Sequence, residues 1–183
     1  MMAELVHIKG LTELKRAMQA LPTNIARNVL RASVNAGARV VRDQARINAP
    51  VLTQAQPKHQ PPGTLKRSIV TAYIPEKSNA QQATYFVTVR QGKKYRGQGK
   101  HQNKSQDAFY GAWVELGHHY VAPKPKNTNW KRHRHHQHAT GVFVPAHPFL
   151  RPAYESKKYE SVQAIREYLL KRLPQEVEKA RRS

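Results

Sequence analysis

Four of the ten histidines in this 183-residue chain lie close together, within the sequence KRHRHHQH. Imidazole nitrogens bind transition metals, and two histidines on one face of a strand can chelate an ion. A metal-dependent hydrolase is therefore one hypothesis, and its candidate ligands are His133, His135, His136 and His138. Metal ligands must be held rigidly, but this segment has no helical or strand periodicity, and no carboxylate lies between Glu115 and Glu155. We therefore expect no physiological metal site and no other cofactor.

Other enzyme chemistries lack the side chains that they need. The chain has no cysteine, no Gly-x-Ser-x-Gly sequence, and only two aspartates, Asp43 and Asp107. The segment from Glu115 to His119 is similar to a helical glutamate–histidine metal motif, but Gly117 interrupts the helix and the spacing is wrong. Residues 96–100 contain two glycines but lack the Lys-Ser/Thr end of a phosphate-binding loop. The sequence therefore predicts that the protein is not an enzyme.

The net charge points to an acidic partner. Lysine and arginine number 32 against 11 aspartates and glutamates, which gives a formal charge of +21. Self-repulsion of this size is relieved by nucleic acid, by an acidic protein surface or by anionic lipid, although a charge run can also simply be solvated. Tyr95 and Trp130 accompany the basic segments, so a free-standing, non-specific DNA- or RNA-binding protein is an alternative function. The candidate contacts to DNA or an acidic partner are Lys93, Lys94, Arg96, Lys100, Lys131, Arg132 and Arg134.

Membrane association is not predicted. No run of residues approaches the ~20 apolar positions that a membrane span needs, and the N-terminal sequence MMAELVHIKG lacks the apolar centre of a signal peptide. The absence of cysteine fits synthesis in a reducing compartment. We therefore expect a soluble protein without a membrane partner.

The periodicity of the sequence predicts a single α+β domain over residues 1–183, with its core at about 10–173. Apolar residues recur at helical spacing in a short segment, 11–21, in a long one from 23 to about 47, and again from 152 to about 173. Residues 65–74 and 85–89 resemble two strands that pair antiparallel, and residues 141–144 form a further strand candidate. The expected fold is a small antiparallel sheet flanked by a long helix in the N-terminal half and a C-terminal helix. Three long basic loop insertions interrupt it, at about 54–62, 91–107 and 118–140.

Five segments occur in a recognisable order: GLTELKRAMQALP, RDQARINAPVLT, GTLKRSI, YGAWVELG and PAHPFLRPAYE. Together they resemble the HK97 gene-product-ten family of tailed-phage neck and tail-completion proteins. In that family a helix ending in Ala-Pro is followed by Gly-x-Leu-Arg-x-Ser-Ile, by an aromatic-Val-Glu-x-Gly-Thr motif, and by Pro-Phe-Leu-Arg-Pro-Ala before the last helix. The counterparts here are residues 49–50, 63–69, 113–117 and 148–153. Lys66 stands where arginine is usual, and His118 replaces the threonine.

The resemblance implies a virion structural protein that joins the head connector to the tail around the DNA channel. It further implies a homo-oligomeric ring, a hexamer or a dodecamer, that binds the head–tail connector and the tail-terminator or tail-tube proteins. Non-specific contact with genomic DNA, assembly in the host cytoplasm and a final location in the virion neck or tail would follow. The candidate interface or structural residues are Glu115, Phe149, Leu150 and Arg151. For Glu115 we expect a structural or interfacial role, and for Phe149 packing in the core.

Overall fold

A computed structural model describes residues 15, 16, 19, 23–51, 61–79, 81–92, 107–120 and 141–182. Its elements are α2 (Thr23–Asn48), α3 (Thr64–Ser68), β1 (Ile69–Tyr73), the 3-10 helix η1 (Pro75–Lys77), β2 (Tyr85–Val89), α5 (Gly111–Leu116), β3 (His118–His119), β4 (Phe143–Val144) and α7 (Leu150–Arg182). The predicted α+β class is confirmed: a small antiparallel sheet accompanies one long helix from the N-terminal half and one from the C-terminal end. The predicted helix at 11–21 lies outside the described residues except for three positions.

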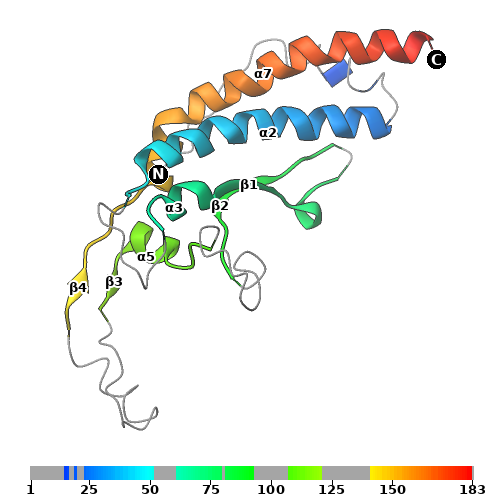
Figure 1. Cartoon of the computed structure of the whole chain (residues 1–183). Helices are drawn as coiled ribbons and strands as arrows, with labels where there is room; N and C mark the ends of the chain where they lie inside the picture. Colours follow the sequence, from blue (N-terminus) through cyan, green and yellow to red (C-terminus); the bar gives the residue numbers. More distant parts are fainter. Residues whose placement is uncertain are drawn as a thin grey trace, which may run out of the picture.

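The two long helices lie side by side, and α2 is the middle layer of the molecule. Figure 1 shows α7 on one side of α2 and the strands β1 and β2 on the other. The buried face of α2 consists of Ala26, Val29, Ser33, Gly37, Val41 and Ala45. Of this face, only Val29 belongs to the apolar stripe that helical spacing predicts for residues 23–47, namely Ile25, Val29, Ala32, Ala36 and Val40. Small residues mark the true face because α7 approaches closely: a Cβ atom on Gly37 would lie 2.6 Å from Ile165 Cγ1 and 2.7 Å from the Ser161 carbonyl oxygen.

The sheet next to α2 consists of two antiparallel strands, as predicted. Ile69 pairs with Val89 and Tyr73 pairs with Tyr85. The predicted first strand began too early, because residues 64–68 form the short helix α3. Gly63, with φ 76°, supplies the left-handed residue before this helix, and Leu65 and Ser68 are buried at helical spacing.

A second, very short pair of strands frames the third predicted insertion. β3 pairs antiparallel with β4, with His118 opposite Val144 and His119 opposite Phe143. The strand candidate at 141–144 is thus confirmed for residues 143–144, and β3 lies at the start of the insertion predicted at about 118–140, of which residues 121–140 lie outside the described residues. A strand of two residues is too short to show a period in the sequence, so its pairing could not be predicted.

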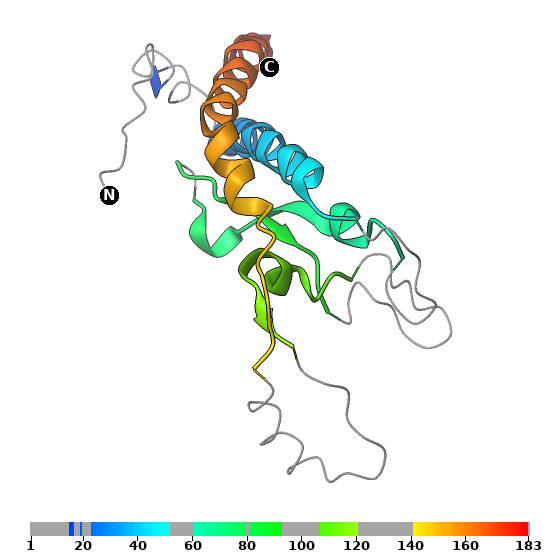
Figure 2. The ribbon, with the colours of Figure 1, turned by 90° about the vertical axis from the view of Figure 1, so that its left-hand side faces the viewer.

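Two clusters of buried side chains hold the described residues together. The first lies where α2 ends and α7 begins, and contains Val41, Ala45, Ala49, Leu65, Ile69, Ala108, Phe149 and Ala153. The second joins the far halves of the long helices through Ala26, Val29, Leu169 and Leu173. In Figure 2 the helix pair lies above the strands, and β3 and β4 extend away from it. None of the helices in the described part is both long and apolar enough to span a membrane.

Candidate assembly interface

The carboxylate of Glu115 holds the start of the C-terminal helix. Glu115 lies in α5, and its Oε2 accepts hydrogen bonds from the backbone N–H groups of Phe149 (2.7 Å) and Leu150 (2.9 Å). Its Oε1 accepts a third from Arg151, at 3.0 Å. The first N–H groups of a helix have no partner within the helix, and the helix dipole favours a negative charge there. The first turn of α7 contains no acidic residue of its own, so Glu115 supplies this charge from a separate helix.

Residues 114–120 and residues 142–147 lie side by side. The His147 N–H donates to the Val114 carbonyl at 2.8 Å, and the Tyr120 N–H donates to the Val142 carbonyl at 2.8 Å. Gly117 lies in the middle of this contact with φ 74°. A Cβ atom on Gly117 would lie 2.9 Å from the Val144 carbonyl oxygen and 3.0 Å from the Ala146 nitrogen. Both the backbone angle and the space therefore require glycine after the Trp-Val-Glu-Leu segment.

The structure brings together all four residues singled out as an interface or structural motif. Phe149 is fully buried in the first core cluster, and Leu150 packs against that cluster. The Arg151 side chain is 79% exposed, and its Nε lies 3.6 Å from Glu155 Oε1. Phe149 and Glu115 therefore serve the fold within the chain, whereas the Arg151 guanidinium is accessible to a partner.

Asp107 is a buried carboxylate that the sequence analysis assigned to an insertion. Its side chain is fully buried and accepts a hydrogen bond from the Gly92 N–H at 2.9 Å. The Ala108 N–H donates to the Arg90 carbonyl at 3.0 Å, so the two chain segments that flank residues 93–106 are joined. Burial raises the pKa of Tyr110, next to this contact, above its ordinary value of 10.0, while a hydrogen bond with the Leu65 backbone and the Arg67 charge oppose the shift. A lone aspartate in a polar segment gave no sequence signal of burial.

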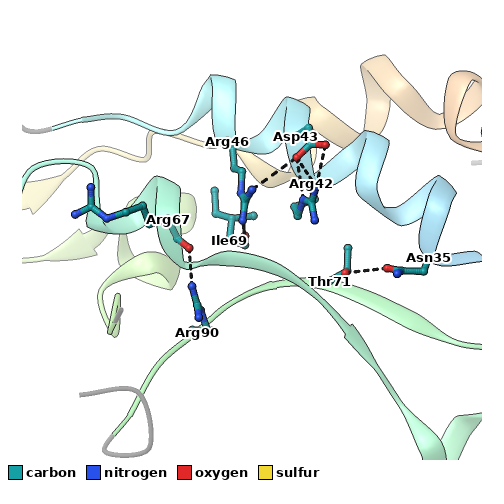
Figure 3. A network of polar contacts seen from close by, with 8 residues as sticks. All are labelled: Asn35, Arg42, Asp43, Arg46, Arg67, Ile69, Thr71 and Arg90. Atoms are coloured by element: carbon teal, nitrogen blue, oxygen red, sulfur yellow. Dashed lines mark hydrogen bonds and ion pairs between the residues drawn. The ribbon is translucent and has the colours of Figure 1, made fainter. Parts of the chain in front are cut away.

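Arg46, near the end of α2, binds the first residue of the sheet. The Arg46 guanidinium donates two hydrogen bonds to the Ile69 carbonyl, at 3.1 and 2.8 Å, and approaches Asp43 at 3.8 Å (Figure 3). The Thr71 hydroxyl donates to Asn35 at 2.9 Å, also between β1 and α2. These contacts tie β1 to α2 and cover the outer edge of β1 at Ile69, and β2 forms the other edge of the sheet.

Aromatic side chains around α5 form an exposed cluster beside the Glu115 contact. Trp113 is 50% exposed, stacks on His118 with ring centres 5.6 Å apart, and meets the edge of Phe109 at 5.7 Å. His119 meets Phe143 at 5.3 Å. Large apolar side chains left exposed together are typical of surfaces that bind another protein.

The candidate cations for contact with DNA or an acidic partner lie outside the described residues: Lys93, Lys94, Arg96, Lys100, Lys131, Arg132 and Arg134. The four clustered histidines, His133, His135, His136 and His138, lie outside them too. Within the part of the chain that the structure describes, no group of histidine, aspartate and glutamate side chains is arranged to hold a metal ion.

Residues 12–117 match a protein-family model described as "Bacteriophage HK97-gp10, putative tail-component". The chain belongs to this HK97-gp10-like family. The match covers more than half of the chain and ends at Gly117, so it includes the Glu115 motif but not the Pro-Phe-Leu-Arg-Pro segment that Glu115 contacts. A search of curated proteins and a search of solved structures found no match.

Membership in the HK97-gp10-like family gives the chain a structural role in the phage tail and a location in the virion. It implies contacts with other virion proteins and argues against an enzyme. Glu115 itself serves the fold of the chain, because it accepts all three of its hydrogen bonds from backbone N–H groups of α7 and the residue before it.

Proposed function

We propose that the protein is a ring-forming neck or tail-completion subunit that joins the head connector to the tail around the DNA channel. The observation that carries the proposal, beyond family membership, is the attachment of three basic segments to one core. Residues 52–60, 93–106 and 121–140 contain one, five and five lysines or arginines, in that order, and no aspartate or glutamate. Such segments suit contact with DNA phosphates or with the acidic surfaces of neighbouring rings.

The described residues that flank these segments lie at or near the first core cluster. Ala49 and Leu65 belong to that cluster on either side of residues 52–60, and Ala108 belongs to it two residues after the end of residues 93–106. Val114, which packs against the same cluster, binds the chain that returns from residues 121–140. The described residues that flank all three segments therefore lie toward the end of the molecule where α7 begins, away from the second cluster. A ring subunit whose basic segments start from one end could direct that end of every copy toward the same partner.

The oligomeric state of the full-length protein tests the ring. We expect light scattering after size-exclusion chromatography to show a closed oligomer, a hexamer or a dodecamer, at high concentration or in the presence of the neighbouring connector. The proposal would be contradicted if the protein stayed monomeric under both conditions and if heads and tails still joined in phage that lack the protein.

The alternative is a free-standing, non-specific DNA- or RNA-binding protein, which the +21 charge favours. A salt titration of duplex-DNA binding separates the two functions, because each phosphate contact releases counterions and steepens the salt dependence. Tight binding by the isolated subunit with a steep salt slope supports the alternative. Weak binding by the subunit that becomes tight only in assembled rings supports the neck role.

A further inference from the structure

An apolar groove of about 550 Å³ lies between the two long helices and β2. Its lining comes from four elements and consists of Val34, Ala38, Val41, Tyr85, Phe86, Val87, Glu115, Leu150, Arg151, Tyr154, Ser161 and Ile165. Tyr154 remains 60% exposed and Phe86 45% exposed. Groove surface of this kind is suited to apolar side chains from a partner.

The hydrogen-bonding pattern of the sheet shows that β2 presents an open edge. The Arg90 N–H donates to the Ser68 carbonyl and the Ile74 N–H donates to the Thr84 carbonyl, just beyond the two ends of the strand pair. Hydrogen-bonded and non-hydrogen-bonded pairs alternate in an antiparallel sheet, so the backbone groups of Tyr85 and Val87 point away from β1. Among the described residues, no hydrogen bond engages them.

The other edge of the sheet is covered only at its first residue, where the outward carbonyl of Ile69 accepts two hydrogen bonds from Arg46. Among the described residues, the outward backbone groups of Thr71 and Tyr73 make no hydrogen bond, so the adjoining groove is what distinguishes β2. An uncovered edge strand is a template for pairing with another chain, and proteins normally cover such edges or place charges on them. The β2 edge is uncovered and also lines the groove, so one extended segment could pair with β2 and place alternate side chains in the groove.

The charges near β2 indicate what kind of segment would bind there. Cations lie near both ends of β2: Lys77 Nζ is 5.3 Å from the centre of the Phe86 ring, and the Arg90 guanidinium follows the strand and donates to the Arg67 carbonyl. Arg151 adds a third cation on the groove itself. The one carboxylate that lines the groove, Glu115, is occupied by three N–H groups of α7. A second copy of this chain, also at +21, would be repelled by these cations.

We propose that the β2 edge and the adjoining groove bind an extended apolar strand flanked by carboxylates, contributed by an acidic neighbouring protein of the virion. The strand pairs with the outward backbone groups of Tyr85 and Val87. Its apolar side chains contact Tyr154 and Leu150, and its flanking carboxylates pair with the cations at the ends of β2. This binding surface does not depend on the ring proposed above.

The test uses the full-length protein and a labelled probe peptide with a Val-Thr-Val-Thr-Val core and two glutamates at each end. We expect saturable binding by fluorescence anisotropy, and binding at least about tenfold weaker for the same core flanked by lysines. Val87→Pro removes one outward N–H group without touching the β1 pairing, whereas the control Val87→Ala shortens the side chain and keeps that group. We expect Val87→Pro to weaken binding by at least about tenfold relative to Val87→Ala, because proline removes one backbone hydrogen bond to the peptide and disturbs the strand geometry.

A second pair of variants tests the groove. Tyr154→Ala should weaken peptide binding several-fold, whereas Tyr159→Ala, at an exposed tyrosine of the same helix outside the groove lining, should leave it unchanged. Circular dichroism melts identify any variant that has lost its fold. Three results would overturn the proposal: no binding of the acidic peptide, equal binding by Val87→Pro and Val87→Ala, or equal binding of the acidic and basic peptides. Self-association that Val87→Pro abolishes, with no peptide binding, would assign the edge to a second copy instead.

Discussion

At the scale of single residues, Glu115 is an interaction point for two segments that are far apart in the chain. One carboxylate accepts hydrogen bonds from three successive backbone N–H groups at the start of α7. Hydrogen bonds to a charged acceptor are stronger than neutral ones, and the helix dipole adds to them. The two family motifs at residues 113–117 and 148–153 are therefore joined by direct hydrogen bonds.

Replacing Glu115 tests this contact. We expect Glu115→Ala to lower the free energy of unfolding by about 2 kcal/mol, because three N–H groups lose their acceptor. Glu115→Gln keeps one carbonyl oxygen but no charge, and should cost about 1 kcal/mol. Urea unfolding measures both values. The control is Glu155→Ala, which removes only an exposed pair with Arg151 and should change stability by less than about 0.5 kcal/mol. An equal effect of Glu115→Ala and Glu155→Ala would contradict the assignment.

Arg46 joins α2 to β1 through the geometry of its guanidinium as well as through its charge. Lysine cannot reproduce the two hydrogen bonds that the guanidinium donates to the Ile69 carbonyl. We expect Arg46→Lys to destabilise the protein by about 1 kcal/mol, and Arg39→Lys, at an exposed position of the same helix, to change stability by less than about 0.5 kcal/mol. Thermal melts of the two variants under identical conditions provide the comparison.

At the scale of the elements, the close approach of α2 and α7 depends on one glycine. Alanine normally stabilises a helix relative to glycine by about 1 kcal/mol. At Gly37 the added methyl group would meet the Ser161 carbonyl oxygen, which belongs to the backbone of α7 and cannot rotate away. We expect Gly37→Ala to destabilise the protein by about 1–3 kcal/mol in urea unfolding, despite the better helix propensity.

A matched variant separates packing from propensity. Ala36→Gly, one position away and only partly buried, changes propensity without adding volume and should cost about 1 kcal/mol. If Gly37→Ala raised the free energy of unfolding, the packing of the two helices would be looser than the structure indicates.

The same scale shows what the sequence could predict and what it could not. The long helices and the antiparallel pair of β1 and β2 have enough residues for a period to be visible, and their types were predicted correctly. The predicted buried face of α2 was wrong, because Ser33 and Gly37 are buried in the close contact with α7 and carry no hydrophobic signal. The pairing of strand β3 and the burial of Asp107 depend on contacts distant in the chain, which no local pattern reports.

At the scale of the whole molecule, the positive charge is unevenly distributed along the chain. Residues 52–60, 93–106 and 121–140 carry lysine and arginine without any carboxylate, and the last of these segments contains the four clustered histidines. The described residues that flank the segments lie at or near the core cluster that contains Phe149. Basic segments that start from one core fit the proposed joint between a DNA-filled head and a tail.

We expect the histidine cluster to make the proposed association sensitive to pH. Histidine with an ordinary pKa near ~6.5 gains charge as the pH falls, so binding to DNA or an acidic neighbour should tighten between about pH 7.5 and about pH 5.5. A variant in which His133, His135, His136 and His138 are all alanine should lose most of this dependence. Binding measured across this range that is the same for both proteins would remove the role of the cluster.

The central claim is that copies of this chain form a ring at the joint of head and tail, and an electron-microscopy map of the assembled virion neck tests it most directly. We expect a closed ring of copies around the DNA channel, with the end of each copy that carries the Glu115 contact directed toward DNA or an adjacent ring. Density for the protein at another part of the tail, or copies that do not close into a ring, would contradict the claim.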